Sequence, residues 1–527
     1  MKMVLVWLFL PLVSCLDLSD WPVTTYDDDI SNFTDYRVFR ITPSKADVLS
    51  FLRTLYWGLP HTTLDFWQPP TSLNHTVDVA VAPAVSQRFF NELYYRQIPY
   101  QILIPNLQQA IDEERTIQNV QMDAHHIHFD RYNTFEQIES YLFDIHQKYP
   151  HLVKLREIGK SYENRTLWVV QLGKPRTEKK AKLWIDAGIH AREWISPAVA
   201  LAFINKLLTG YGKDEEITEL MDYMDWLVLP VMNPDGYVHT FAKNRMWRKN
   251  RRPSSCYKTT MSTMCCVGVD LNRNFNWFWA TTGSSTDPCH DTYHGTGPFS
   301  ESESRSVKEF LEKTKVDGFM SFHSYSQLWL IPYGHKKRTY PEDYSTVLKP
   351  LALQATNALG KLYGTKYIAG TGADLMYEAS GASHDFAKGN LQIKYAYLVE
   401  LRPQNTMFAN GFLLPEREIV PTCEETWEAV KVVAHAIIND SQEGITTQIR
   451  QTITPAPYTE QTQVTFTTNG LIISTKEVTT EPTVMPNRIV QCVDHSRYCK
   501  WWKVHHLCHK ERVKKQCPLS CLAECKI

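Results

Sequence analysis

Two short stretches of the sequence carry residue types that bind metals. His190 and Glu193 lie three residues apart, just after an apolar run at 183–185 that is typical of a buried strand. His323 follows a second such run, Gly318–Phe322. Two imidazoles and one carboxylate with an open fourth position are the ligand set of catalytic zinc. The alternatives are an ordinary surface His–Glu pair and, for His323 alone, a hydrogen-bonded core histidine.

Hydrolysis at such a metal also needs a base. Glu400 is a carboxylate that follows the apolar run Tyr395–Val399, where a lone buried charge is costly. Glu400 therefore needs either a function or a partner, and the adjacent Arg402 is the alternative partner. Arg248 lies in the basic run 245–252 and Arg273 lies close to Asp270, so on residue type alone a solvated surface is the favoured interpretation of both.

These residues must be positioned by a larger fold. Between about 125 and 440, apolar β-type runs alternate with helical stretches, which indicates an α/β fold with a mixed, mostly parallel sheet flanked by helices. Open sheets of this class bind ligands beyond the carboxyl ends of their strands. His190 and Glu193 are therefore expected on a loop at a strand end, before a helix with Ser196 as N-cap and Pro197 at its first position.

A smaller unit precedes this fold. Strand-like runs at 36–41, 77–81 and 100–104 and helical stretches at 46–57 and 85–94 predict a small open-sandwich α+β domain. It ends in a polar connector, 108–121, which contains Arg115. Charged, loosely patterned connectors are the preferred sites of proteolysis.

The two ends of the chain indicate export and an appended module. Residues 1–15 have the pattern of a signal peptide, and no later run of about 20 apolar residues predicts a membrane span. We therefore expect a secreted protein with disulfides and N-glycosylation sequons. Residues 441–488 are rich in Thr, Gln and Pro and predict a linker. Six cysteines within 492–525 predict a disulfide-rich module, for which spacing alone allows 15 pairings.

The net charge of −1 gives no indication of nucleic acid as a partner.

Several motifs in order resemble those of the pancreatic A/B-type zinc metallocarboxypeptidases, which are made with an activation prosegment. The resemblance covers roughly 20–440. It rests on GIHAREW at 188–194, NPDGY at 233–237, MWRK at 246–249, VDLNRN at 269–274, HSYSQ at 323–327, YEASG at 377–381 and ELR at 400–402.

The resemblance implies a role for each matching residue. It implies that one zinc ion is held by His190, Glu193 and His323. Glu400 would be the general base, and Arg248 would stabilise the oxyanion. The residues implied to bind substrate are Asn272 and Arg273 at the free carboxylate, Tyr377 as a mobile cover, and Arg192 and Tyr325 in neighbouring subsites.

The resemblance also places His384 in the pocket for the C-terminal side chain. A-type relatives have an apolar residue there and B-type relatives have an acid, so a histidine departs from both. An imidazole cannot pair with lysine or arginine, so basic C-terminal residues are disfavoured. Ala382 and Leu398 replace smaller residues and make the pocket shallower. We expect neutral side chains, with apolar or aromatic ones favoured, and acidic ones only if His384 is protonated.

Two resemblances imply most of the cysteine pairings. The carboxypeptidase resemblance implies the bridge Cys266–Cys289, while Cys256 and Cys265 are additional and are expected to pair with each other, leaving Cys423 as a buried free thiol. The tail resembles an ShK-type toxin-like module, which implies the pairs Cys492–Cys525, Cys499–Cys517 and Cys508–Cys521. The expected organisation is signal peptide 1–15, propeptide 16–115, catalytic domain 122–440, linker 441–488 and module 492–525.

The expected partners are peptides or proteins with a free C-terminus and an activating protease that cuts near Arg115, and the protein is expected to be a monomer. A catalytically silent binding protein on the same fold is one alternative, but the candidate ligands and base are all present. A zinc hydrolase of non-peptide amides or esters is another. Asn272 and Arg273 argue against it, because they select a free carboxylate.

Overall fold

A computed structural model describes Leu18, Trp21 and residues 32–59, 61–114, 126–253, 255–258, 263–405 and 410–452. The predicted signal peptide, Arg115, most of the predicted linker and the three predicted tail disulfides lie outside these residues. Within the described part, no helix is both long enough and apolar enough to cross a membrane.

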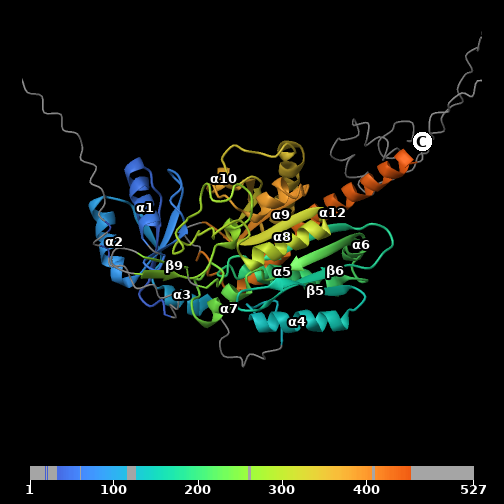
Figure 1. Cartoon of the computed structure of the whole chain (residues 1–527), viewed down its shortest axis with the longest axis horizontal. Helices are drawn as coiled ribbons and strands as arrows, with labels where there is room; N and C mark the ends of the chain where they lie inside the picture. Colours follow the sequence, from blue (N-terminus) through green and yellow to red (C-terminus); the bar gives the residue numbers. More distant parts are fainter. Residues whose placement is uncertain are drawn as a thin grey trace, which may run out of the picture. The chain divides into compact units, whose positions relative to one another are not determined.

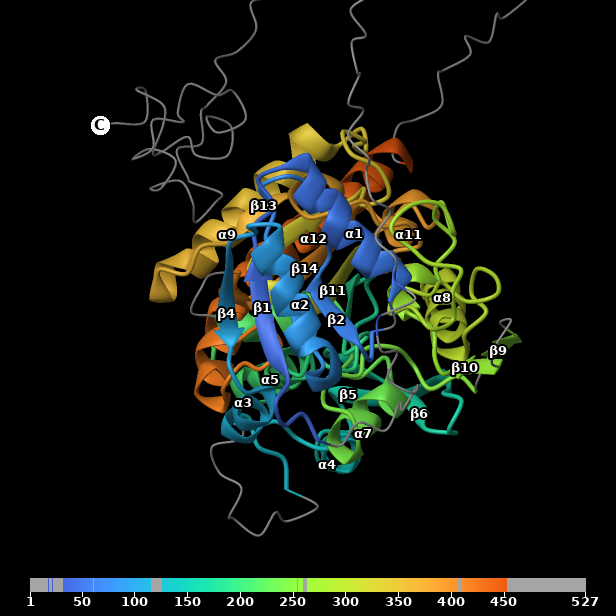
Figure 2. The same cartoon turned by 90° about the vertical axis from the view of Figure 1, so that its left-hand side faces the viewer.

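The N-terminal part is a four-stranded antiparallel sheet with two helices on one face. Its strands run in the order β2-β3-β1-β4. Their bounds are β1 Arg37–Ile41, β2 Leu64–Gln68, β3 Val77–Val81 and β4 Tyr100–Ile104. The helices α1 (Ala46–Gly58) and α2 (Pro83–Tyr95) cover the sheet, as Figure 2 shows. Phe51 and Phe89 from these helices join Phe39 and Val79 from the strands in one core.

The large part is built on an eight-stranded mixed sheet of order β13-β12-β14-β11-β7-β8-β6-β5. The pairs in its centre, β14/β11, β11/β7 and β7/β8, are parallel. The strands are β5 Val153–Lys160, β6 Thr166–Leu172, β7 Ala181–Ala187, β8 Met224–Leu229, β11 Gly318–Ser326, β12 Leu328–Ile331, β13 Ile368–Thr371 and β14 Tyr395–Gln404. The predicted α/β fold with a mostly parallel sheet is therefore confirmed.

Helices cover both faces of this sheet (Figure 1). They are α4 Phe135–Lys148, α5 Ile195–Gly210, α6 Glu215–Tyr223, α7 Pro234–Ala242, α8 Ser302–Thr314, α9 Lys349–Tyr363, α10 Gly372–Leu375, α11 Ser383–Gly389 and α12 Ile419–Thr452. Neighbouring residues of a strand point to opposite faces. Leu183 and Ile185 accordingly pack in the core under α5 and α12, whereas Trp184 packs with Val307 of α8 and Phe386 of α11.

Three local predictions from the sequence are wrong. Ser196 is not the N-cap of its helix: α5 begins at Ile195, and the Ser196 hydroxyl instead accepts a hydrogen bond from Gly188 N. Part of the polar connector is helical, as α3 (Leu107–Glu114), because Leu107 and Glu114 are buried on the large part. The helix α12, which has Pro421 in its first turn, continues to Thr452 and so extends past the predicted start of the linker at 441.

The cysteines of the large part pair as follows. Cys256 bonds to Cys265 across the hairpin of β9 (Ser255–Lys258) and β10 (Thr263–Cys266), and Cys266 bonds to Cys289. Cys423 is a buried free thiol in α12, and burial raises its pKa to about 12.

The start of α4 provides a test of local stability. Thr134 Oγ1 accepts a hydrogen bond from Gln137 N, and Gln137 Oε1 accepts one from Thr134 N, which forms a capping box. We expect Thr134→Ala to lower the free energy of unfolding by about 1 kcal/mol, measured by urea denaturation. Thr209→Ala, on an exposed helical threonine, should change it by less than about 0.5 kcal/mol. Equal effects of the two substitutions would refute the cap.

Candidate active site

The strand register brings the candidate metal ligands together. β11 lies beside β7 in parallel with Phe322 opposite Ala187, so His323 stands beside the loop that follows β7. Gly188 begins this loop with φ 63°, and a Cβ there would lie 3.1 Å from the Pro197 side chain. His323 lies within β11 rather than beyond it, opposite Glu400 on β14.

His190, Glu193 and His323 form one buried cluster whose ligand atoms all lie within 4.8 Å of one another. The two imidazoles face each other with their Nδ1 atoms 3.2 Å apart. Glu193 Oε1 lies 2.7 Å from His190 Nδ1, and Glu193 Oε2 lies 3.1 Å from His323 Nδ1. Ligand atoms around a tetrahedral zinc ion are about 3.3 Å apart. The spacing of these donors therefore fits a single zinc ion.

The opposite edge of each imidazole is held by a buried acceptor. His190 Nε2 lies 3.2 Å from Asp270 Oδ1. His323 Nε2 lies 3.0 Å from the hydroxyl of Ser321, which donates in turn to Asp186 Oδ1 at 2.5 Å. Both Nε2 atoms therefore carry the ring proton, and both Nδ1 lone pairs point at each other. Two lone pairs facing each other beside a carboxylate are repulsive unless a cation lies between them, which supports the metal assignment.

Asp270 connects the metal ligands to the arginines of the site. Besides His190, its carboxylate accepts hydrogen bonds from Arg248 Nε and NH2 at 3.2 and 2.8 Å, and Arg273 NH1 lies 3.8 Å away. Burial opposes ionisation of Asp270, but the charges of Arg248, Arg273 and His190 outweigh it and hold its pKa well below the usual range. Asp270 is therefore a permanent anion.

Glu400 is the second carboxylate at the cluster and lines the same cavity as His190 and Glu193. Burial, reinforced by the charge of Glu193, raises its pKa well above the usual range. Arg402 is not its partner, since that side chain binds Glu425 and Glu418. The alternative of a Glu400–Arg402 ion pair is therefore wrong, and Glu400 remains available for chemistry.

Asn272 and Arg273 lie on a short 3-10 turn, Leu271–Arg273, that Asp270 caps. Arg273 Nε donates to Gly283 O at 2.8 Å and its NH1 donates to Asn272 O at 3.0 Å, which fixes the guanidinium at the cavity. The ring of Tyr377 lies 6.0 Å from this guanidinium. These two residues and Tyr377 line one cavity of about 70 Å³ together with His384, Leu398 and Ala382.

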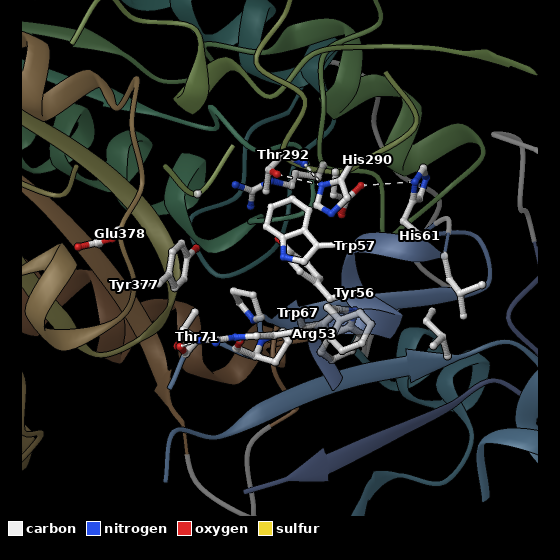
Figure 3. A pocket seen from close by; sticks show the side chains of 18 of the residues that line it. Arg53, Tyr56, Trp57, His61, Trp67, Thr71, His290, Thr292, Tyr377 and Glu378 are labelled. Carbon is white, nitrogen blue, oxygen red and sulfur yellow. Dashed lines mark hydrogen bonds and ion pairs between the residues drawn. The ribbon is translucent and has the colours of Figure 1, made fainter. Parts of the chain in front are cut away.

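The N-terminal part lies over this site. Asp65 accepts two hydrogen bonds of 3.1 Å from Arg192 NH1, and Asp78 accepts one of 2.8 Å from the Tyr325 hydroxyl. Glu114 forms a buried, two-pronged ion pair with Arg245, with both distances 2.7 Å. A cavity of about 500 Å³ lies between the N-terminal part and the large part. Trp57 of the N-terminal part and Tyr377 of the large part both line it (Figure 3).

The structure thus brings all the candidate residues of the sequence analysis to one region. Sequence reasoning missed Asp186, Ser321 and Arg245 as supporting residues. Asp270 was noted only as part of a motif. The sequence did contain an indication of Asp186 and Ser321, because both are polar residues inside otherwise apolar strands. Such residues need a polar partner, and the neighbouring parallel strands β7 and β11 place them opposite each other.

Comparisons with known proteins agree with this geometry. The family model described as "Zinc carboxypeptidase" matches residues 138–429, and that described as "Carboxypeptidase activation peptide" matches residues 39–114. Carboxypeptidase A2 of Rattus norvegicus is 40% identical, with 76% of this chain and 93% of the relative covered. Zinc carboxypeptidase A 1 of Anopheles gambiae is 37% identical, with 76% and 89% covered. The crystal structure of thrombin activatable fibrinolysis inhibitor is 33% identical, with a TM-score of 0.69 and with 77% of this chain and 100% of that chain covered.

The Ser321 hydroxyl can be tested as a support of the metal site. We expect Ser321→Ala to weaken zinc binding by about 10–100-fold, because His323 loses the acceptor that fixes its orientation. Competition with a chromogenic chelator measures this affinity directly. Ser306→Ala is the matched control, since that hydroxyl only bonds within α8. Unchanged zinc affinity in Ser321→Ala would show that the hydroxyl does not support the ligand.

Proposed function

Because this chain belongs to the zinc carboxypeptidase family, we propose that it is a secreted zymogen that removes the C-terminal residue of peptides and proteins. The observation that carries the proposal is one cavity lined by His190, Glu193, Glu400 and Arg273, with His323 completing the ligand cluster. Metal ligands, a base and a carboxylate receptor are the three parts that hydrolysis next to a free C-terminus requires.

Glu400 and Arg248 carry the proton and charge changes of the reaction. When bound, zinc acidifies a water molecule and polarises the scissile carbonyl. Glu400, which lines the same cavity as His190 and Glu193, would take up the proton released when water attacks and pass it to the leaving amine. Arg248 stabilises the negative charge on the carbonyl oxygen, and Asp270 holds its guanidinium in place.

Asn272 and Arg273 recognise the terminal carboxylate. Arg273 supplies positive charge in a position fixed by two backbone oxygens, which lowers the entropic penalty of binding. Tyr377 closes over the bound residue, and Arg192 and Tyr325 contact the residues upstream of the scissile bond. The proposed cofactor is one zinc ion per chain.

The N-terminal part keeps the enzyme inactive until it is cut. Asp65 and Asp78 hydrogen-bond Arg192 and Tyr325, two residues proposed to bind substrate. An activating protease cuts near Arg115, between the proposed propeptide 16–115 and the catalytic domain 122–440. The signal peptide at 1–15 directs secretion, and the ShK-type module at 492–525 is an appended binding unit.

His384 sets the class of C-terminal residue that is removed. A neutral imidazole at this position cannot form the ion pair that a lysine or arginine side chain needs. Leu330, Met376 and Leu398 supply apolar walls to the same cavity. We therefore propose neutral C-terminal residues as substrates, with apolar and aromatic side chains accepted and basic ones disfavoured.

Removal of the base tests the mechanism. We expect Glu400→Gln to lower kcat/KM on a C-terminal reporter peptide by about 10²–10⁴-fold, because the amide cannot take a proton. Zinc content, measured by atomic absorption, should be unchanged, since Glu400 is not a ligand. Glu312→Gln, on an exposed residue of α8, should retain full activity. A fully active Glu400→Gln enzyme would exclude this residue as the base.

Processing and metal removal test the zymogen proposal. The full-length chain should release C-terminal residues from a mixed peptide library only after trypsin-type proteolysis, because the cut frees Arg192 and Tyr325 from their carboxylate partners. A chelator should abolish release, and added zinc should restore it. Mass spectrometry of the library identifies each released residue. Equal rates before and after proteolysis would argue against shielding by the N-terminal part.

A further inference from the structure

A separate cavity lies at the edge of the large sheet that is opposite to the catalytic residues. Its volume is about 390 Å³, within the range of roughly 300–1,000 Å³ that is usual for ligand pockets. Lys182 and Asp225, which line it, stand near the amino ends of the parallel strands β7 and β8. His190 and Glu193 follow the carboxyl end of β7 instead. The seven residues of β7 thus separate the two sites by roughly 20 Å, at about 3.3 Å per residue.

Positive side chains dominate the lining of this cavity, which we call the basic cavity. Six cationic side chains from three separate segments line it: Lys154, Arg176, Lys179, Lys180, Lys182 and Lys315. Three anionic side chains also line it: Glu178, Asp225 and Asp317. The whole chain carries a net charge of −1, so the positive excess here is a local feature.

Lys180 fixes the shape of the basic cavity. Its buried ammonium group donates hydrogen bonds to Lys174 O at 2.9 Å and to Met221 O at 3.0 Å, and it pairs with Asp225 at 2.8 Å. An ammonium group has three N–H donors, and these three contacts use all of them. Lys180 therefore holds the loop 174–180 in place but is not available to a ligand.

Three other lysines of the basic cavity have no charged partner. Lys154, Lys179 and Lys315 are exposed, and within the described part of the chain none of them forms an ion pair. Arg176, by contrast, is paired with Glu178 at 3.3 Å. Three unpaired cations around one concave site create a positive potential that attracts anions. A ligand with several spaced negative charges could contact all three lysines at once.

The surroundings favour sulfate groups on a sugar chain as this ligand. Five of the nine residues 174–182 are Lys or Arg, a density that is typical of nucleic-acid or heparin binding. No phenylalanine, tyrosine or tryptophan lines the basic cavity, so it offers no such ring on which a base could stack. The two disulfides of the large part are typical of secreted proteins, which meet sulfated polysaccharides outside the cell.

We propose that the basic cavity binds a sulfated polysaccharide and holds the protein on the extracellular matrix while the active site stays accessible. Lys154, Lys179 and Lys315 supply the contacts to the sulfate groups. The inference does not rest on the proposed hydrolytic activity. The N-terminal part contacts Arg192 and Tyr325, at the other edge of the sheet. The precursor and the processed protein should therefore bind the polysaccharide equally well.

Immobilised heparin tests the proposal on the full-length precursor. We expect the wild-type protein to be retained at about 0.15 M salt and to elute at higher salt, because salt screens contacts between exposed charges. The triple variant Lys154→Gln, Lys179→Gln and Lys315→Gln should bind heparin about tenfold more weakly, because three charge contacts are lost together. Surface plasmon resonance measures the two affinities.

A matched triple variant separates the cavity from the overall charge. Lys213→Gln, Lys361→Gln and Lys366→Gln remove three exposed lysines elsewhere and should leave the affinity for heparin unchanged. Both triple variants lose the same charge and keep the basic C-terminal residues 488–515, so a difference between them belongs to the cavity. Double-stranded DNA serves as a second polyanion, and we expect it to bind more weakly than heparin.

The activity of the processed, zinc-loaded protein is measured separately. Saturating heparin should leave the release of a C-terminal residue from a reporter peptide unchanged, because the two sites are at opposite edges of the sheet. Loss of retention of the wild type, equal weakening in the two triple variants, DNA binding as tight as heparin binding, or inhibition by heparin would each overturn the inference. A protein that binds heparin as expected but releases no residue would contradict the proposed function alone.

Discussion

One buried anion holds the catalytic centre together. Asp270 contacts His190, Arg248 and Arg273 and has no exposure to solvent. Its charge is stable only because these partners compensate for the loss of water. It contacts three side chains for which we propose different functions, namely His190 at the metal, Arg248 at the oxyanion and Arg273 at the terminal carboxylate. The relative placement of these three side chains thus depends on one buried carboxylate.

The parallel register is the second constraint on the site. His190 and Glu193 follow β7, His323 lies in β11 and Glu400 lies opposite it in β14, so three adjacent strands bring these four side chains together. Their convergence could be predicted from the sequence, because each residue lies near an apolar β-type run and open α/β sheets bind ligands at the carboxyl ends of their strands. The roles of Arg248 and Arg273 could be expected only from the family resemblance.

Other features could not be predicted because they depend on tertiary contacts. The chain Asp186–Ser321–His323 exists only once β7 and β11 are in register. The stretch 107–114 is polar, yet it forms α3 because Glu114 finds a buried arginine on the large part. Ser196 looked like a helix cap, but its hydroxyl bonds to Gly188 and Glu193 instead. The local sequence pattern therefore predicted most helices and strands, but it did not predict which side chains they would contact in the folded protein.

The contacts of Asp65 and Asp78 with Arg192 and Tyr325 have a thermodynamic consequence. If the same guanidinium and hydroxyl bind substrate, occupancy of the cleft and docking of the N-terminal part exclude each other. Binding linkage then requires the effect to be reciprocal. A tight cleft ligand would loosen the N-terminal part by the same factor by which that part weakens the ligand. In the zymogen, the N-terminal part and the cleft ligand would compete for the same side chains. The N-terminal part would compete at a high effective concentration, because it is tethered to the same polypeptide.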